Sequence, residues 1–235
     1  EPSNETQWPG SPESYFEMLV AAYASIKRAD PAAIVQDGGL SSGTVGYLQV
    51  DEIYRAGRYD EALALMDRVR AGLAGNADDP PPPATRAELD AIMAGESMAR
   101  KRRWIELLRQ HRDSLDAFQI HFYGDWDLLP DAMRWAARQG IDRPIEVWEL
   151  SERRARGFAD DSEVADDMVK LMTVAAGEGS AYTLFYNYVD WVAPAGYFPG
   201  NIDAAGQPRP PIERAWQTLT EHITDAVRSS PVALG

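Results

Sequence analysis

The sequence predicts an α/β protein built on a parallel β-sheet, and two observations support this. Apolar, strand-like runs alternate strictly with helical patterns along the chain, which implies parallel strands joined by helical crossovers. These runs are almost continuously apolar, as expected for strands covered on both faces. The chain has 235 residues, enough for one large domain or two small ones.

The N-terminal part predicts one helix and one strand. Residues 12–29 carry apolar side chains at three- and four-residue spacing, typical of one face of a helix. A proline stands near the start, and Asp30-Pro31 marks the end. Residues 32–40, AAIVQDGGL, form a short apolar run closed by two glycines. This pattern indicates a buried strand followed by a loop.

A long helical insertion is predicted before the second strand. Residues 44–75 are mostly helical in pattern, and residues 75–86 form a loop with four consecutive prolines. A second helix is expected over about 86–113. Its basic run ARKRRW is interpreted as a solvent-facing surface or as a set of ion-pair partners for acidic neighbours.

From residue 115 onward, strands and helices alternate regularly. Aromatic and β-branched residues indicate the strands, whereas apolar periodicity and terminal glycines indicate the helices. The predicted elements are a strand at 115–126, a helix at 129–141, a strand at 143–150, a helix at 160–179, a strand at 181–191 and a helix at 210–227.

Composition excludes several classes of function. The net charge of −14 argues against nucleic acid or an anionic membrane as a partner, and no apolar run approaches the roughly 18 residues of a membrane span. There are no cysteines, and the three histidines are widely spaced. The sequence therefore predicts no metal site and no cofactor. It also has no nucleophile elbow of a serine hydrolase and no glycine-rich phosphate loop.

Each predicted strand ends in polar or aromatic residues that suit a sugar. A buried carboxylate at a strand end must be paired, protonated or used in chemistry. The carboxyl ends of parallel strands meet at one rim, so these groups are expected together. The strand ends are Gln36-Asp37, His121-Phe122-Tyr123, Glu149, and Tyr186-Asn187-Tyr188 followed by Asp190-Trp191.

Four segments carry a specific resemblance to a known family. IHFYGDW, RPIEVWELS, AYTLFYNYVDW and GNIDAAGQPRPPIERAW, in this order, resemble the second half of a clan A glycoside hydrolase. This is the 4/7 superfamily of retaining enzymes with a (β/α)8 TIM-barrel fold, and the details are similar to family 39. The resemblance covers most of residues 1–50 and 115–225.

The resemblance implies that the chain is a single portion of a catalytic barrel, from the end of strand four through strand eight. Residues 1–50 would supply the strand-four loop, helix four and strand five. Residues 51–113 would be a helical insertion, longer than the usual connection at this point. Residues 114–235 would supply strands six to eight and the closing helices. Four strands cannot close a barrel alone, so the missing N-terminal half is expected in the same parent chain or in another chain.

Two glutamates take the catalytic roles that the resemblance implies. Glu149 falls where the family has its nucleophile, at the end of strand seven. Glu1 precedes Pro2 where the family reads Asn-Glu-Pro, and would be the acid/base. The asparagine of that motif is absent. The Glu1-Pro2 pair is therefore either the remainder of the family motif or a chance match.

The same rim suggests substrate-binding residues. Tyr123 could donate a hydrogen bond to the nucleophile and keep it charged, and His121 could orient a hydroxyl or a carboxyl. Asn187 and Asp37 are also assigned to substrate binding, although Asp37 could instead cap a loop. The indoles that could stack on a sugar, or alternatively serve only in packing, are Trp8, Trp126 and Trp191.

The expected function is retaining hydrolysis of β-linked glycosides by double displacement, with a carbohydrate substrate. The alternative is a non-catalytic carbohydrate-binding or scaffold relative with the same barrel. The N-terminus EPSNETQWPG has no basic or apolar region of a signal peptide. The compartment therefore stays open, with an extracellular or periplasmic location only slightly favoured over the cytoplasm.

Structural roles remain open for the main candidates. Glu149 could form an ion pair with Arg153 or Arg154, and His121 could be a core histidine with its hydrogen bonds satisfied. Glu146 is expected to point away from Glu149 and to be structural, because an odd number of strand positions separates the two.

Overall fold

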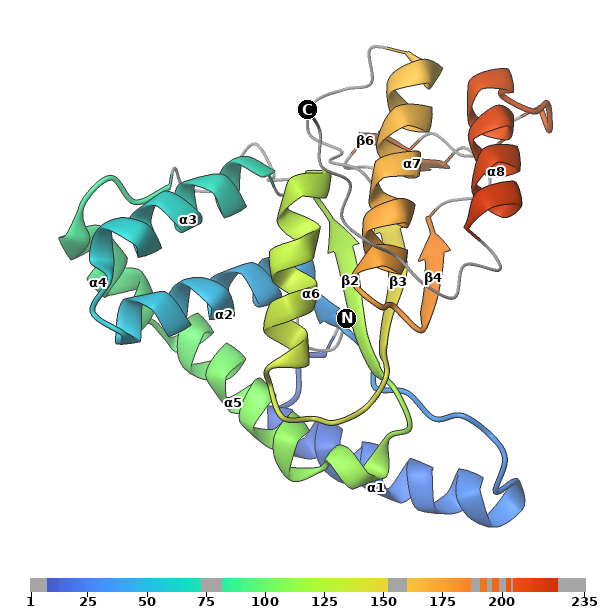
Figure 1. The fold of residues 1–235 in the computed structure, drawn as a ribbon. Helices are drawn as coiled ribbons and strands as arrows, with labels where there is room; N and C mark the ends of the chain where they lie inside the picture. The colour runs from blue at the N-terminus through green and yellow to red at the C-terminus, as the bar shows by residue number, and fades with distance from the viewer. Residues whose placement is uncertain are drawn as a thin grey trace.

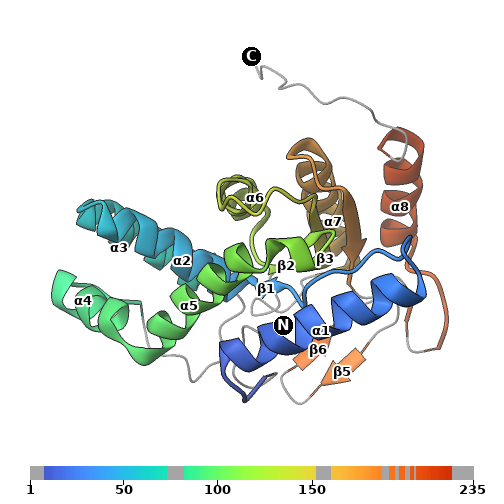
Figure 2. The same ribbon diagram turned by 90° about the horizontal axis from the view of Figure 1, so that it is seen from below.

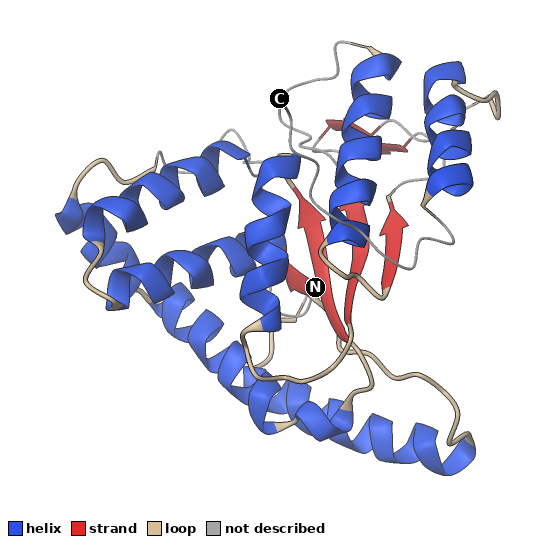
Figure 3. Ribbon diagram, in the orientation of Figure 1, coloured by secondary structure: helices blue, strands red, loops and turns tan. Residues whose placement is uncertain are grey.

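The computed structural model describes residues 8–72, 82–151, 160–186, 191–193, 196–198, 202–203 and 205–223. Four strands form one sheet in the order β1-β2-β3-β4, and every neighbouring pair is parallel. The predicted α/β class with a parallel sheet is therefore confirmed (Figures 1 and 3). The strands are β1 (Leu40–Ser41), β2 (Phe118–Tyr123), β3 (Ile145–Ser151) and β4 (Tyr182–Phe185), and a separate antiparallel pair is made by β5 (Trp191–Ala193) and β6 (Gly196–Phe198).

Three helices cover one face of the sheet, and β5 and β6 lie on its other side (Figure 2). These helices are α6 (Leu129–Ala137), α7 (Asp161–Gly177) and α8 (Pro210–His222). Phe118, Ile120 and Val147 from the strands share one buried hydrophobic cluster with apolar side chains of these helices. The face of the sheet toward the helices is thus the main core.

The other helices precede β1 or lie between β1 and β2. They are α1 (Pro12–Ala29), α2 (Ser42–Arg55), α3 (Tyr59–Gly72), α4 (Arg86–Ala94) and α5 (Glu96–Gln110), and single 3-10 turns stand at Arg112–Ser114 and Trp126–Leu128. Helix α1 packs on α5, where the rings of Phe16 and Trp104 lie 5.4 Å apart. No helix in the described ranges is both long and apolar enough to cross a membrane.

The insertion has a small hydrophobic core of its own. Its predicted long helices are each divided at a glycine. Gly57 adopts φ +75° between α2 and α3, and Gly95 separates α4 from α5. The second core cluster consists of Val50, Ala62, Met66, Leu89, Met93 and Met98.

The first strand differs from the expectation for residues 32–40. Gln36 makes one isolated parallel bridge with Ala117, and regular pairing begins only at Leu40, opposite Ile120. Between these points the Asp37 carboxylate, instead of a backbone carbonyl, accepts the hydrogen bond of the Gln119 amide at 2.9 Å. A side chain thus replaces one rung of the ladder, which interrupts the strand.

Gly39 makes this interruption possible. It adopts φ +81°, and a Cβ atom at this position would lie 2.7 Å from His121 Nε2 and 3.1 Å from Gln119 Oε1. Only glycine tolerates both the left-handed backbone and the close approach of two buried side chains.

We expect Gly39→Ala to lower the free energy of unfolding by roughly 2–4 kcal/mol, because backbone strain and a steric clash add. Gly57→Ala is the matched control: it has nearly the same φ, +75°, but no atom within 4 Å of the new Cβ. Its cost should be about 1 kcal/mol. Urea unfolding of both variants checks this, and equal costs would show that the close approach is unimportant.

Candidate active site

Strand β2 presents a row of polar side chains on the face opposite the covering helices. Gln119, His121 and Tyr123 alternate with apolar residues that enter the main core. Because successive side chains of a strand point to opposite faces, these three share one face of the sheet. Gln119 and His121 are each only 6% exposed, so their polar atoms depend on protein partners.

A β-bulge in β3 directs Glu149 toward this row. The pairing of β2 with β3 steps from His121↔Trp148 to Tyr123↔Ser151, so β3 contains one extra residue. Glu149 lies within the bulge and adopts φ +51°. The Tyr123 hydroxyl donates to Glu149 Oε2 at 2.6 Å, and His121 Nδ1 lies 3.5 Å from the same oxygen.

The Glu149 side chain combines a fixed carboxylate oxygen with access to solvent. It is 41% exposed, whereas the neighbouring His121 side chain is 7% exposed. Among the described residues, only Asp142 and Glu149 have positive φ without being glycine. Such a backbone costs on the order of 1–3 kcal/mol, and strain of this kind concentrates at functional sites. The contact between Tyr123 and Glu149 that the sequence suggested is present.

Glu146 also lies on the polar face, so the expectation that it points away from Glu149 is wrong. Its Oε2 accepts hydrogen bonds from Trp148 Nε1 at 2.9 Å and from Gln36 Nε2. Gln36 Oε1 in turn accepts from Gln119 Nε2 at 2.7 Å. Counting positions assumes a regular strand, whereas the bulge resets the alternation between Glu146 and Glu149.

Asp37 is buried beneath the row rather than open to a ligand. It is 4% exposed and closes the gap in the ladder described above, which supports a capping role. Burial raises its pKa to about 7, although hydrogen bonds from the Gln119 and Gly39 amides and the charge of His121 act to lower it. Tyr15 accepts from the Gly38 amide at 2.7 Å, and burial, with a smaller effect of Asp37, raises the Tyr15 pKa above its ordinary value.

The structure describes the surroundings of two of the predicted sugar-stacking indoles. Trp8 lies edge-on to Tyr15 with ring centroids 5.6 Å apart, and its Nε1 donates to the Ser11 carbonyl at 3.1 Å. Trp126 is exposed, and the Lys170 ammonium of α7 lies 5.8 Å from its ring. No contact of these two indoles with Glu149 appears among the described residues.

Several predicted site residues lie outside the described residues. Glu1 and Asn187 belong to them. Arg153 and Arg154, the possible ion-pair partners of Glu149, also lie outside the described residues. The backbone of Trp191 is part of β5, but its side chain is not described. The pairing of Glu1 with Glu149 therefore stays a prediction.

The sequence indicated Gln36 and Tyr186 as groups at strand ends, but it did not predict Gln119 or the contacts that connect the strands. Gln36 and Gln119 link Glu146 to His121, and the Tyr186 ring lies edge-on to Tyr123 at 6.1 Å. Polar residues at alternate positions of an otherwise apolar strand, Gln119 and His121, were a readable signal. Gln36 was indicated only as a strand-end residue, because its partners depend on how β1 and β3 flank β2. Within the described ranges no group of three or more potential ligands could hold a metal ion.

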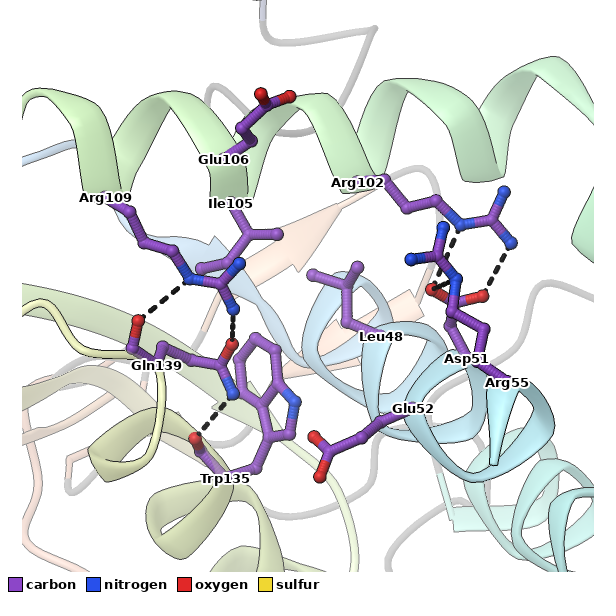
Figure 4. A pocket seen from close by; sticks show the side chains of 10 residues that line it. All are labelled: Leu48, Asp51, Glu52, Arg55, Arg102, Ile105, Glu106, Arg109, Trp135 and Gln139. Carbon is purple, nitrogen blue, oxygen red and sulfur yellow. Dashed lines mark hydrogen bonds and ion pairs between the residues drawn. The ribbon is translucent and has the colours of Figure 1, made fainter. Parts of the chain in front are cut away.

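A cavity of about 450 Å³ lies elsewhere, between α2, α5 and α6 (Figure 4). Its three lining arginines each bind another lining residue. Arg102 pairs with Asp51 at 2.6 Å, Arg55 pairs with the same carboxylate at 3.1 Å, and Arg109 donates to the Gln139 carbonyl at 2.8 Å. The Arg109 contact joins the insertion to the segment after α6, whereas the two Asp51 pairs lie within the insertion. We assign the cavity no ligand.

Comparisons with known proteins give little similarity. No protein-family model and no curated protein matches the sequence. Among solved structures, the crystal structure of an agarase, AgWH50C, aligns with a TM-score of 0.37 and 15% identity. The alignment covers 51% of this chain and 20% of the agarase chain. A likeness this low supports no conclusion about fold or function.

The buried carboxyl of Asp37 predicts a specific pH dependence of stability. The folded-state pKa of about 7 exceeds the ordinary value of 3.8, so the folded chain holds a proton that the unfolded chain has released. The free energy of unfolding should therefore fall as the pH rises from about 4 to about 7. The contribution of this group to that fall is on the order of 4 kcal/mol. Asp37→Asn removes this titration and can still accept from the Gln119 amide.

Urea unfolding at several pH values tests this prediction. Asp37→Asn should show a flatter profile and exceed the natural protein in stability at pH 8. Asp67→Asn, at an exposed position of α3, is the control and should keep the original profile. An unchanged slope in Asp37→Asn would contradict the prediction.

Proposed function

We propose that this chain carries the nucleophile of a retaining glycoside hydrolase that cleaves β-linked sugars. The observation that carries the proposal is the setting of Glu149. Its carboxylate lies at the carboxyl end of a parallel strand, on a strained bulge, open to solvent and held by Tyr123. A nucleophilic carboxylate needs this combination of orientation and access.

The proposed mechanism uses two carboxyl groups. Glu149 attacks the anomeric carbon and forms a covalent glycosyl ester while the glycosidic bond breaks. A second carboxyl, which we assign to Glu1, protonates the leaving oxygen and then takes a proton from the water that cleaves the ester. The hydrogen bond from Tyr123 stabilises the ionised form of Glu149 and orients it for attack.

The substrate-binding residues are part of this proposal. His121 and Tyr123 lie beside the Glu149 carboxylate. Asn187 and Trp191 follow β4 along the chain. We add Trp148 to the substrate-binding residues predicted from the sequence, because it comes directly before Glu149 and its indole contacts Glu146 on the polar face. Trp8 and Asp37 are left out, because their observed contacts are structural, whereas the exposed Trp126 is kept as a residue that stacks on a sugar.

Glu149→Gln should lower kcat/KM on an aryl β-glycoside by at least roughly 10³-fold in the complete gene product, without loss of the fold. Glu178→Gln is the matched control, since Glu178 pairs with Arg134 on the helix-covered side. Azide should restore turnover of Glu149→Gly and yield a glycosyl azide. Glycine also relieves the strain of the positive φ, so the free energy of unfolding of this variant should be about 1 kcal/mol higher.

Two results would contradict the enzyme proposal. Loss of activity equal in Glu149→Gln and Glu178→Gln would show that the effect is not specific to Glu149. No activity in any form, with sugar binding unchanged by Glu149→Gln, would favour the non-catalytic carbohydrate-binding alternative.

We further propose that additional β/α units complete a barrel around this sheet. Both sheet edges expose apolar side chains. Ile34, next to the β1 edge, is 72% exposed, and Tyr182 and Leu184 are exposed on β4. An apolar edge of this kind is usually covered or paired, and a closed parallel barrel needs about eight strands.

Hydrogen exchange on the complete gene product tests the barrel proposal. The Ala181 amide donates to Ile145 of β3, so the next amide along, that of Tyr182, faces the open edge. In a completed barrel, the Tyr182 amide should exchange as slowly as amides within β2. Exchange at the rate of an exposed loop would show that this edge is open.

A further inference from the structure

A chain of hydrogen bonds crosses the polar face from Glu146 to the candidate nucleophile. Gln36 Nε2 donates to Glu146 Oε2, and Gln119 Nε2 donates to Gln36 Oε1 at 2.7 Å. Gln119 Oε1 lies 2.8 Å from His121 Nε2. We call Glu146, Gln36, Gln119 and His121 the polar relay. His121 Nδ1, at its far end, lies 3.5 Å from Glu149 Oε2.

Glu146 determines the direction of every bond in the polar relay. The Trp148 indole can only donate, so Glu146 Oε2 acts as an acceptor at 2.9 Å. Gln36 must then turn its amide nitrogen to Glu146 and its oxygen to Gln119. Gln119 accordingly turns its oxygen to His121, and an amide oxygen can only accept.

The histidine therefore carries its proton on Nε2. A neutral imidazole with this proton has a lone pair on Nδ1, the nitrogen that faces Glu149. A lone pair against an ionised carboxylate oxygen is repulsive. The contact becomes attractive only when a proton lies between the two groups, either on the carboxyl or on Nδ1 of an imidazolium.

We propose that Glu146 is a positioning residue that selects the Nε2–H tautomer of His121, so that neutral His121 turns the lone pair of Nδ1 toward Glu149. Its importance for catalysis rests on the proposed function, because His121 lies beside the proposed nucleophile. The tautomer itself follows from the hydrogen bonds alone. Without the polar relay, neutral His121 would carry the proton on Nδ1 and donate it to Glu149 directly.

Nitrogen-15 NMR of labelled histidines tests this directly in the folded protein. The chain has only three histidines, and His111→Gln and His222→Gln assign the His121 signals without changing the site. We expect neutral His121 to show a protonated Nε2 and an unprotonated Nδ1. A protonated Nδ1 in the neutral ring of the natural protein would overturn the proposal.

Glu146→Met tests the role of the distant carboxylate. Without this acceptor the Trp148 indole can donate to Gln36 Oε1, which reverses the direction of both amides and moves the His121 proton to Nδ1. The ratio of the two tautomers should change at least about fivefold. An unchanged ratio in a folded variant would show that Glu146 does not select the tautomer.

Two further variants complete the test. Gln119→Met interrupts the polar relay beside His121 and should shift the tautomer in the same direction, which provides an answer if Glu146→Met does not fold. Trp148→Phe leaves Glu146 as acceptor for Gln36 and should keep the Nε2–H tautomer, whereas a shift would contradict the assigned direction. None of these signals depends on catalytic activity, so failure of the enzyme proposal and failure of the tautomer proposal are distinguishable.

Discussion

The bulge at Glu149 is the constraint on which the candidate site depends. A regular strand would place Glu146 and Glu149 on opposite faces of the sheet, because three positions separate them. The extra residue of β3 and the positive φ of Glu149 bring both acids to the polar face. One acid thereby becomes a buried hydrogen-bond acceptor, while the other stays open to solvent.

The two faces of the sheet place different demands on the sequence. The face toward α6 and α7 requires only apolar side chains of fitting volume, and Phe118, Ile120 and Val147 meet this requirement. The polar face requires that nearly every buried donor and acceptor find a partner, since an unpaired buried group costs about 1–3 kcal/mol. Gln36, Gln119 and Glu146 are best explained as members of such a network.

The helical insertion is organised separately from the site. It has its own hydrophobic cluster around Met66 and Met93, and the ion pair of Arg103 with Glu13 of α1 attaches it to its surroundings. The basic run within α5 forms ion pairs with acidic neighbours, which is one of the two roles expected from the sequence. The length of the insertion therefore does not disturb the parallel order of the strands.

Sequence patterns alone determined the order and type of most elements, because apolar spacing reports which side of a helix or strand is buried. They also indicated Glu149, His121 and Tyr123 as groups at strand ends. Patterns could not show the interruption at Asp37 and Gly39 or the bulge at Glu149, because both arise from pairing with a neighbouring strand.

Only the tertiary structure decided which polar groups meet. Gln36 and Glu146 are 110 positions apart, and only the arrangement of β1 and β3 on either side of β2 brings them together. A hydrogen bond depends on distance and direction within a few tenths of an ångström, and no spacing along a single strand contains that information.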